Sequence, residues 1–244
     1  FFRAMINAIY QGKLVVNNKE VNDVPLEAQS LAAGNARIKY QTTWIGKLPP
    51  IVKRHEVWQP LSKALTLLEE TESAPVLPDG KIGGNLALRV NIDDQASGLV
   101  VSRSGKHFGE VSKAEDFTVV TKFDPSKWSA QYLSQSSDIR PSSDTPLLWH
   151  ALMLAADKCG WKEKPVAALH GHAFETLEEA ERLGLPISHE ETLFSTPEDS
   201  EALMLLFNKY HYPEHKVFIR QGHGFFILGP DMPAACQTLQ ALVK

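Results

Sequence analysis

Three histidines have neighbours and a spacing that suit a metal site. His170 and His172 lie two residues apart at the end of an apolar stretch, and strand geometry points both imidazoles to one face. His223 stands between Gly222 and Gly224, and such a glycine pair permits a close backbone approach or a bend that exposes one side chain. Imidazole is a favoured zinc ligand, and a catalytic zinc commonly takes three protein ligands. Histidines at this spacing are also common as core or surface residues, so both interpretations stay open.

A second group of residues has the chemistry to bind an anion. The segment Pro141–Pro146 combines two serines, an aspartate and a threonine directly before a predicted helix over 146–155. Ser and Thr cap helices, Pro favours the first turn, and the N–H groups of a helix N-terminus attract anions. Two turns, Gly83–Asn85 and Ser102–Lys106, offer further hydroxyl, amide and backbone donors. Each segment taken alone is more often an ordinary cap or turn, and that alternative stays open here.

Segments with strand and helix periodicity separate these candidates. Strands are predicted over 86–90, 98–101, 117–121, 166–170, 217–219 and 225–228. Helices are predicted from Trp58 to before Pro75 and over 146–155, 176–183, 198–210 and 233–243. Strands come first and strands mixed with helices follow, which favours a layered α/β domain. We expect residues 1–50 to form an N-terminal extension and residues 51–244 to form this domain.

Composition excludes several classes of function. The 244 residues are 43% hydrophobic and 22% charged, which is typical of a globular chain with an ordinary core. The net charge is -4 and the basic residues are scattered, so no surface for nucleic acid is predicted. The apolar runs are far shorter than the roughly 20 residues of a membrane span. Two widely separated cysteines, Cys159 and Cys236, indicate a reducing cytoplasm.

Five motifs, taken in chain order, resemble the class II aldolase/adducin family. They are Gly84-Asn85-Leu86, Ser102–Lys106, Pro141–Leu147, His170–Ala173, and Arg220–Gly224 with Leu228–Asp231 after it. The resemblance covers about residues 57–244 and leaves the N-terminal extension outside it. It implies the family's fold, a three-layer α/β/α domain with a central, mainly antiparallel sheet.

The resemblance also implies roles for the residues that match its motifs. The divalent metal, Zn²⁺ with Mn²⁺ or Co²⁺ as alternatives, would be held by His170, His172 and His223. Asp144 takes the acidic position of the Ser-Ser-acid-Thr-Pro motif and is the catalytic candidate. That position is Glu in the family's sugar-phosphate aldolases and Asp in its ribulose-phosphate 4-epimerases. The phosphate of a substrate would be bound by Asn85, Ser104, Gly105, Ser142 and Ser143.

These roles imply an enzyme of carbohydrate metabolism. We expect a metal-dependent lyase of the aldolase type that acts on a sugar phosphate or related hydroxy-carbonyl compound through an enediolate. A ribulose-phosphate 4-epimerase-like isomerase and a non-catalytic, metal-binding or adducin-like module are the alternatives. Family members are typically tetramers, so the resemblance implies a homo-oligomer, with no nucleic-acid or membrane partner.

The chain departs from the family's pattern at three places. Its first motif lacks the hydroxyls of the usual Ser-Gly-Asn-x-Ser, and Arg103 stands where the family has Pro. The family's catalytic tyrosine aligns with no residue between His172 and His223. That region contains His189, Glu190 and Glu191, which are either a different acid or base or a charged helix start.

Overall fold

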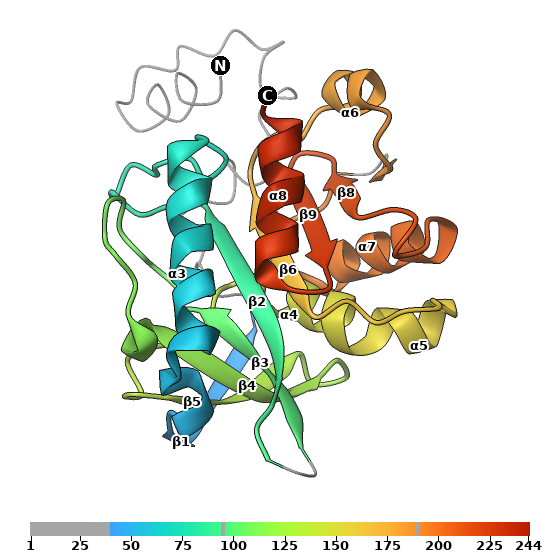
Figure 1. The fold of residues 1–244 in the computed structure, drawn as a ribbon. Helices are drawn as coiled ribbons and strands as arrows, with labels where there is room; N and C mark the ends of the chain where they lie inside the picture. The colour runs from blue at the N-terminus through green and yellow to red at the C-terminus, as the bar shows by residue number, and fades with distance from the viewer. Residues whose placement is uncertain (1–39, 94–95, 189–190) are drawn as a thin grey trace, which may run out of the picture.

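The fold is built on one large mixed sheet. The structure, a computed structural model, describes residues 40–93, 96–188 and 191–244. Within them a nine-stranded sheet has the order β1-β5-β4-β3-β2-β6-β9-β8-β7 (Figure 1). The strands are β1 (Gln41–Lys47), β2 (Gly84–Asn91), β3 (Ser97–Ser102), β4 (Phe117–Asp124), β5 (Ser129–Ser134), β6 (Ala167–Gly171), β7 (Ile187–Ser188), β8 (Val217–Arg220) and β9 (Gly224–Gly229). Among the described strands only the end pairs, β1 with β5 and β7 with β8, are parallel, which confirms the mainly antiparallel sheet.

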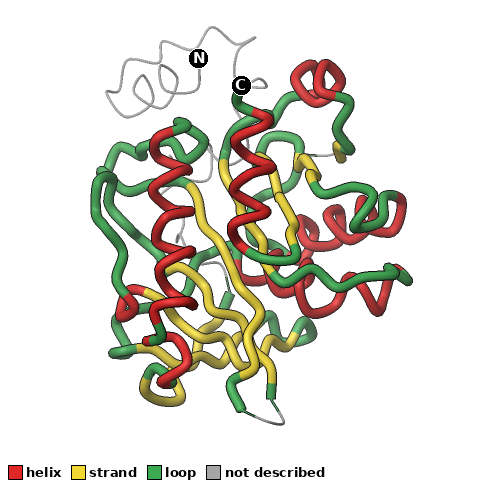
Figure 2. The backbone as a smooth tube through the Cα atoms, viewed as in Figure 1, coloured by secondary structure: helices red, strands yellow, loops and turns green. Residues whose placement is uncertain are grey.

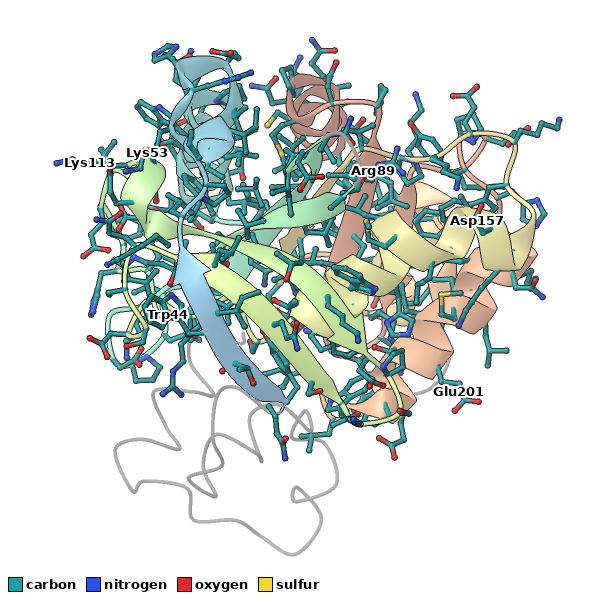
Figure 3. All side chains as sticks on the ribbon, turned by 90° about the horizontal axis from the view of Figure 1, so that it is seen from below. Trp44, Lys53, Arg89, Lys113, Asp157 and Glu201 are labelled. Carbon is teal, nitrogen blue, oxygen red and sulfur yellow. The ribbon has the colours of Figure 1, made fainter. Side chains whose placement is uncertain are left out.

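Helices cover both faces of this sheet. Two long helices, α3 (His55–Glu70) and α8 (Met232–Leu242), lie side by side on one face (Figure 2). The other face carries α4 (Thr145–Trp149), the π-helical turn η4 (His150–Leu154), α5 (Ala155–Cys159) and α7 (Pro197–Lys209). Figure 3 shows the two helix layers apart, with Asp157 and Glu201 in the layer formed by α4, η4, α5 and α7. The three-layer α/β/α architecture is therefore confirmed. The remaining helices among the described residues are η2 (Pro50–Lys53), η3 (Ala114–Asp116) and α6 (Leu177–Leu183).

The central strands are buried on both faces, which is why their sequences are uninterrupted apolar runs. In β9, Phe226 and Leu228 pack into the core beneath α4, α5 and α7. Phe225 and Ile227, which point the other way, pack into the core beneath α3 and α8. Apolar runs of this kind mark strands covered on both sides. The predicted strands over 98–101 and 225–228 are confirmed for this reason.

Three of the described strands are absent from the sequence prediction: β1, β5 and β7. β5 has a buried face with Ala130 and Tyr132, but its other residues are polar or only partly buried, so it has no uninterrupted apolar run. The other two strands are polar or very short. β1 is mostly exposed and lies at one end of the sheet, and β7 has two residues at the other end. Neither has a buried face that would impose a period-two apolar pattern. The boundary between an extension over 1–50 and a domain over 51–244 stays a prediction, and β1 lies on its N-terminal side. No helix in the described ranges is long and apolar enough to cross a membrane.

Candidate active site

The three predicted metal ligands lie together at the end of β6. His170 is in β6 opposite Phe226 of β9, His172 follows the strand, and His223 lies in the turn between β8 and β9. The ring centroids are 5.0 Å apart for His170 and His172, 4.7 Å for His170 and His223, and 5.2 Å for His172 and His223. One ligand nitrogen from each ring lies within 4.8 Å of the other two. Such a cluster has the donor set of a catalytic zinc site.

A close backbone approach brings His223 to the other two histidines. Gly224 has a φ of +122°, and a Cβ atom there would lie 2.1 Å from the Gly171 carbonyl oxygen and 2.8 Å from the Cα atom of His172. Contacts this short exclude any side chain at position 224. The sequence prediction that glycine at this place permits a close approach is confirmed, because only glycine lets the turn lie against the end of β6.

The buried rings are oriented by partners on their outer nitrogens. His170 Nδ1 lies 2.8 Å from the Phe225 carbonyl oxygen, and His223 Nδ1 lies 3.1 Å from Asp199 Oδ2. Metal-binding histidines commonly place the second ring nitrogen on a carbonyl or carboxylate in this way. His170 Nε2 and both ring nitrogens of His223 are buried without a hydrogen bond among the described residues, so His223 meets Asp199 and Asp144 through ion-pair contacts. A divalent metal fits this arrangement, because it would bind the Nε2 atom of each ring, with His223 giving up its proton on binding.

Asp144 lies between these two Nε2 atoms. Its Oδ2 accepts a hydrogen bond from Asn85 Nδ2 at 2.5 Å and lies 3.7 Å from His170 Nε2. Its Oδ1 accepts one from Ser195 Oγ at 2.7 Å and lies 3.5 Å from His223 Nε2. Asp144 is the N-cap residue of α4, yet in the part of the chain that the structure describes its side chain makes no capping hydrogen bond. The carboxylate is therefore directed at the histidine cluster and not at the helix.

Charge at the cluster is set by burial and by two carboxylates. Burial raises the pKa of Asp144, but its contact with the charged ring of His223 and the Ser195 hydrogen bond outweigh burial and hold that pKa well below its usual range. Burial lowers the pKa of His170 to about 3, so this ring is neutral. Burial also lowers the pKa of His223, but Asp199 and Asp144 outweigh it and hold the pKa well above its usual value. The two carboxylates thus favour a positive charge between them.

A cavity connects this cluster to the predicted anion-binding residues. It has a volume of about 530 Å³ and is open to solvent. Its lining includes all five predicted phosphate-binding residues together with the catalytic candidate and one histidine: Asn85, Ser104, Gly105, Ser142, Ser143, Asp144 and His172. His170 and His223 are buried at 0% and 1% exposure; they do not line the cavity but lie next to its lining residues Asp144 and His172. Residues from five separate parts of the chain therefore meet at or beside this cavity.

Solved structures share this arrangement of strands and helices. A sugar-phosphate aldolase from Thermotoga maritima is similar with a TM-score of 0.57 and 11% identity, over 77% of this chain and 92% of that one. An aldolase II superfamily protein from Pseudomonas syringae gives 0.52 and 16%, over 78% and 73%. An L-fuculose 1-phosphate aldolase gives 0.51 and 18%, over 78% and 84%. This chain has the class II aldolase fold.

The likeness is one of structure, and the sequence has diverged widely. No family model matches the chain, and no curated protein sequence matches it significantly. At identities of 11% to 18% the class II aldolase fold is shown, while the chemistry must be argued from the side chains of this site.

Two cations that are not in the predicted anion-binding set line the open end of the cavity. Lys106 is 4% exposed and forms an ion pair with Glu69, which also accepts a hydrogen bond from the Gly109 amide at 2.8 Å. Arg103, which replaces the family's proline, pairs with Glu110 at 2.7 Å. The departure from the family's motif therefore adds a charged side chain to the cavity wall.

Sequence reasoning missed a set of residues behind the histidines. Phe194 lines the cavity, Ser195 contacts Asp144, and Asp199 pairs with both His223 and Arg220. A charged residue ending the apolar strand Val217–Arg220 is a usable signal, because a buried arginine needs a carboxylate partner. Ser195 and Asp199 carry no such signal, since a serine in a loop and an aspartate in the first turn of a helix are common in any sequence.

The segment before Ser195 contains the predicted acid or base substitutes. His189 and Glu190 lie outside the described residues, and Glu191 is exposed. Tyr212, which lies near His223 in sequence, is buried in the core against Trp161. The segment contributes Phe194 and Ser195 to the site instead.

Proposed function

We propose that the protein is a metal-dependent lyase of the aldolase type that cleaves a phosphorylated hydroxy-carbonyl compound. The observation that carries this proposal is a single cavity with a three-histidine cluster and a buried carboxylate at one end and hydroxyl and backbone donors at the other. This arrangement suits a substrate with a carbonyl group at one end and a phosphate at the other.

The open end supplies the groups that bind phosphate. Ser142 and Ser143 precede α4, and Ser104 and Gly105 lie in a turn that lines the same cavity beside them. Their hydroxyl and N–H donors suit the oxygens of a phosphate, and the helix N-terminus adds a favourable field. Lys106 and Arg103 add positive charge at the same end, although each is paired with a carboxylate.

The buried end supplies the groups that act on the carbonyl. His170, His172 and His223 would hold the metal, which when bound supplies Lewis-acid stabilisation of negative charge on a carbonyl oxygen. Asp144 is held charged, so it is suited to accept a proton from a substrate hydroxyl. Asn85 and Ser195 donate one hydrogen bond to each of its oxygens and fix the direction of the carboxylate.

An epimerase is the second candidate function. The acidic position holds Asp144, and aspartate is the residue of the family's 4-epimerases. Both reactions begin with the same proton transfer and carbon–carbon bond cleavage, so the geometry of Asp144 serves either one. A non-catalytic module is less compatible with a carboxylate buried between two histidines, since its burial has an energetic cost without a structural capping role.

Metal analysis followed by a substrate screen tests the proposal. We expect about one divalent metal per chain in protein purified without chelator. Ketose phosphates should release an aldehyde if the protein is a lyase, whereas conversion to an isomeric ketose phosphate would identify an epimerase. A metal-free protein whose melting temperature ignores added Zn²⁺ would contradict both.

We also propose a tetramer in the cytoplasm as the working form. Class II aldolases are typically assembled so that a neighbouring subunit completes the site, and this chain lacks an aligned catalytic tyrosine of its own. Light scattering combined with activity assays tests this assembly. An active monomer would contradict it.

A further inference from the structure

Four buried residues at the histidine end form a closed ring of polar contacts, one of them made by a backbone amide. Asp144 Oδ1 lies 2.7 Å from Ser195 Oγ and 3.5 Å from His223 Nε2. Asp199 Oδ2 lies 3.0 Å from the Ser195 amide nitrogen and 3.1 Å from His223 Nδ1. Two carboxylates are thus bridged twice, once through Ser195 and once through the ring of His223.

The two oxygens of Asp199 have different partners. Oδ1 accepts hydrogen bonds from Arg220 Nε at 2.9 Å and from Thr192 Oγ1 at 3.1 Å. Arg220 is fully buried, and its other nitrogens donate to the hydroxyls of Ser188 and Thr192. Oδ2 is directed at His223 and Ser195. One oxygen therefore anchors the carboxylate to the protein, and the other faces the site.

Ser195 is held in a backbone conformation that needs such support. Its φ is +60°, in the left-handed region, and the residue is fully buried. Its amide donates to Asp199, its carbonyl accepts a hydrogen bond from Trp128 Nε1 at 3.2 Å, and its hydroxyl donates to Asp144. A non-glycine residue persists in this region when its surroundings determine it, and such residues are concentrated at functional sites.

We infer that Asp199 is a positioning residue of this site, whose Oδ2 fixes the ring of His223 and, through Ser195, the carboxylate of Asp144. The inference rests on the proposed function, because it takes His223 as a metal ligand. Arg220 alone does not account for the arrangement, since a carboxylate that served only as its counter-ion would have no need to place its second oxygen on His223 and on the Ser195 amide.

Binding of Co²⁺ alone to the full chain tests the inference without any substrate. We expect Asp199→Asn to weaken Co²⁺ binding about 10- to 100-fold, the range typical of lost partners behind metal ligands. Thr192→Val is the matched control, because it removes a partner of the other oxygen, Oδ1. It should lower the melting temperature and leave the Co²⁺ affinity within about threefold of the native value.

Ser195→Ala tests the other bridge between the two carboxylates, the one that runs through Ser195. We expect it to change the visible absorption of bound Co²⁺, because Asp144 lies against the ring nitrogens and loses one of its two hydrogen bonds. Ser195→Gly should give the same change, which separates loss of the hydroxyl from relief of the left-handed backbone. Ser200→Ala is the control, since that buried hydroxyl has no hydrogen-bond partner among the described residues.

Three results would overturn the inference. They are an Asp199→Asn protein that binds Co²⁺ within threefold of the native one, a Thr192→Val protein that loses as much affinity as Asp199→Asn, and a Ser195→Ala spectrum identical to that of Ser200→Ala. If Asp199→Asn does not fold, the comparison of the Ser195→Ala and Ser200→Ala spectra decides the question by itself. Native protein that binds no Co²⁺ would overturn the proposed function as well, whereas native binding with an indifferent Asp199→Asn overturns this inference only.

Discussion

The two ends of the cavity differ in the solvent exposure of their side chains. At the histidine end, His170, Asp144, Asp199 and His223 are at most 4% exposed, and charged groups lie within hydrogen-bond or ion-pair distance of each other. At the serine end, the turn around Ser104 and Gly105 is partly exposed and open to solvent, and the Lys106–Glu69 ion pair is the buried exception there. Charges interact strongly where water is excluded and weakly where it is present.

This difference separates two tasks. The buried end has the fixed geometry and strong fields that proton transfer and metal binding require. The open end has replaceable donors that decide which molecule is bound. Substitutions at the buried end should therefore abolish function, and substitutions at the open end should change affinity.

Loss of a metal ligand is the largest expected effect. His170→Ala should reduce the bound metal from about one per chain to almost none, because three-ligand sites tolerate no missing ligand. Native protein in a 100-fold excess of Zn²⁺ over its dissociation constant should gain about 2.7 kcal/mol, or roughly 5–10 °C in melting temperature, and the variant should gain nothing. Atomic absorption and thermal unfolding measure both.

A matched control separates this effect from general damage. His150 is also buried but lies outside the cluster, against Phe123 and Trp128. His150→Ala should lower the stability and keep the metal. Equal metal content in His170→Ala and native protein would show that the cluster is not the metal site.

Removal of the charge of Asp144 is the next effect in size. Asp144→Asn keeps the shape, and we expect the turnover number to fall about 10²-fold or more, the scale of a lost general base. The melting temperature should change little if the carboxylate's role is chemical, and near-native circular dichroism would confirm that the fold survives. Full activity on the substrate from the screen would remove Asp144 from the catalytic residues.

Metal affinity should fall as the pH is lowered, because His223 becomes protonated. The raised pKa of His223 means that metal binding must displace a proton, so affinity should drop about tenfold per pH unit below that pKa. His170, with a pKa of about 3, adds no such loss near neutral pH. Chelator competition at about pH 8 and about pH 6 measures the slope. A flat profile would show that His223 is neutral in the folded protein.

The metal-free protein should respond to pH with the opposite sign. A raised pKa in the folded state stabilises the fold, fully so below the ordinary histidine pKa of about 6.5, and this stabilisation is lost as the pH rises through the folded value. Thermal unfolding of chelator-treated protein should therefore show a melting temperature that declines over that window. Bound metal should remove the decline, because it takes the place of the proton.

The serine end should give the smallest effect. Ser142→Ala combined with Ser143→Ala should raise the Michaelis constant about tenfold for a phosphorylated substrate, as expected for lost hydrogen bonds to a charged group. The constant for the unphosphorylated analogue should stay nearly the same. Equal changes for the two compounds would contradict a phosphate site at this end.

Much of the fold could be predicted because its central strands are covered on both sides. The apolar runs over 98–101 and 225–228 follow directly from that burial. The edge strands β1 and β7 could not be predicted, since exposure or shortness removes the pattern. The helix over 145–159 was predicted from its N-terminal residues, while its π-helical turn at 150–154 has no sequence signature.

The sequence by itself determined which residue types were available for chemistry. The two-residue spacing of His170 and His172 is a local property, because alternation along a strand fixes the face to which both rings point. The effect of the glycines beside His223 is also local, because the lack of a Cβ atom widens the backbone conformations of the glycine residue itself. These features predicted the histidine cluster before any contact between strands was known.

Only the tertiary structure decided how the carboxylates are used. Ser195 and Asp144 are 51 residues apart in the chain, and Arg220 and Asp199 are 21 apart, so no local pattern records either contact. A hydrogen bond depends on position to within a few tenths of an ångström, and those positions come from the packing of β8, β9, α4 and α7 around the site. The physical reason is that burial gives each polar atom a few fixed partners, and the path of the chain selects them.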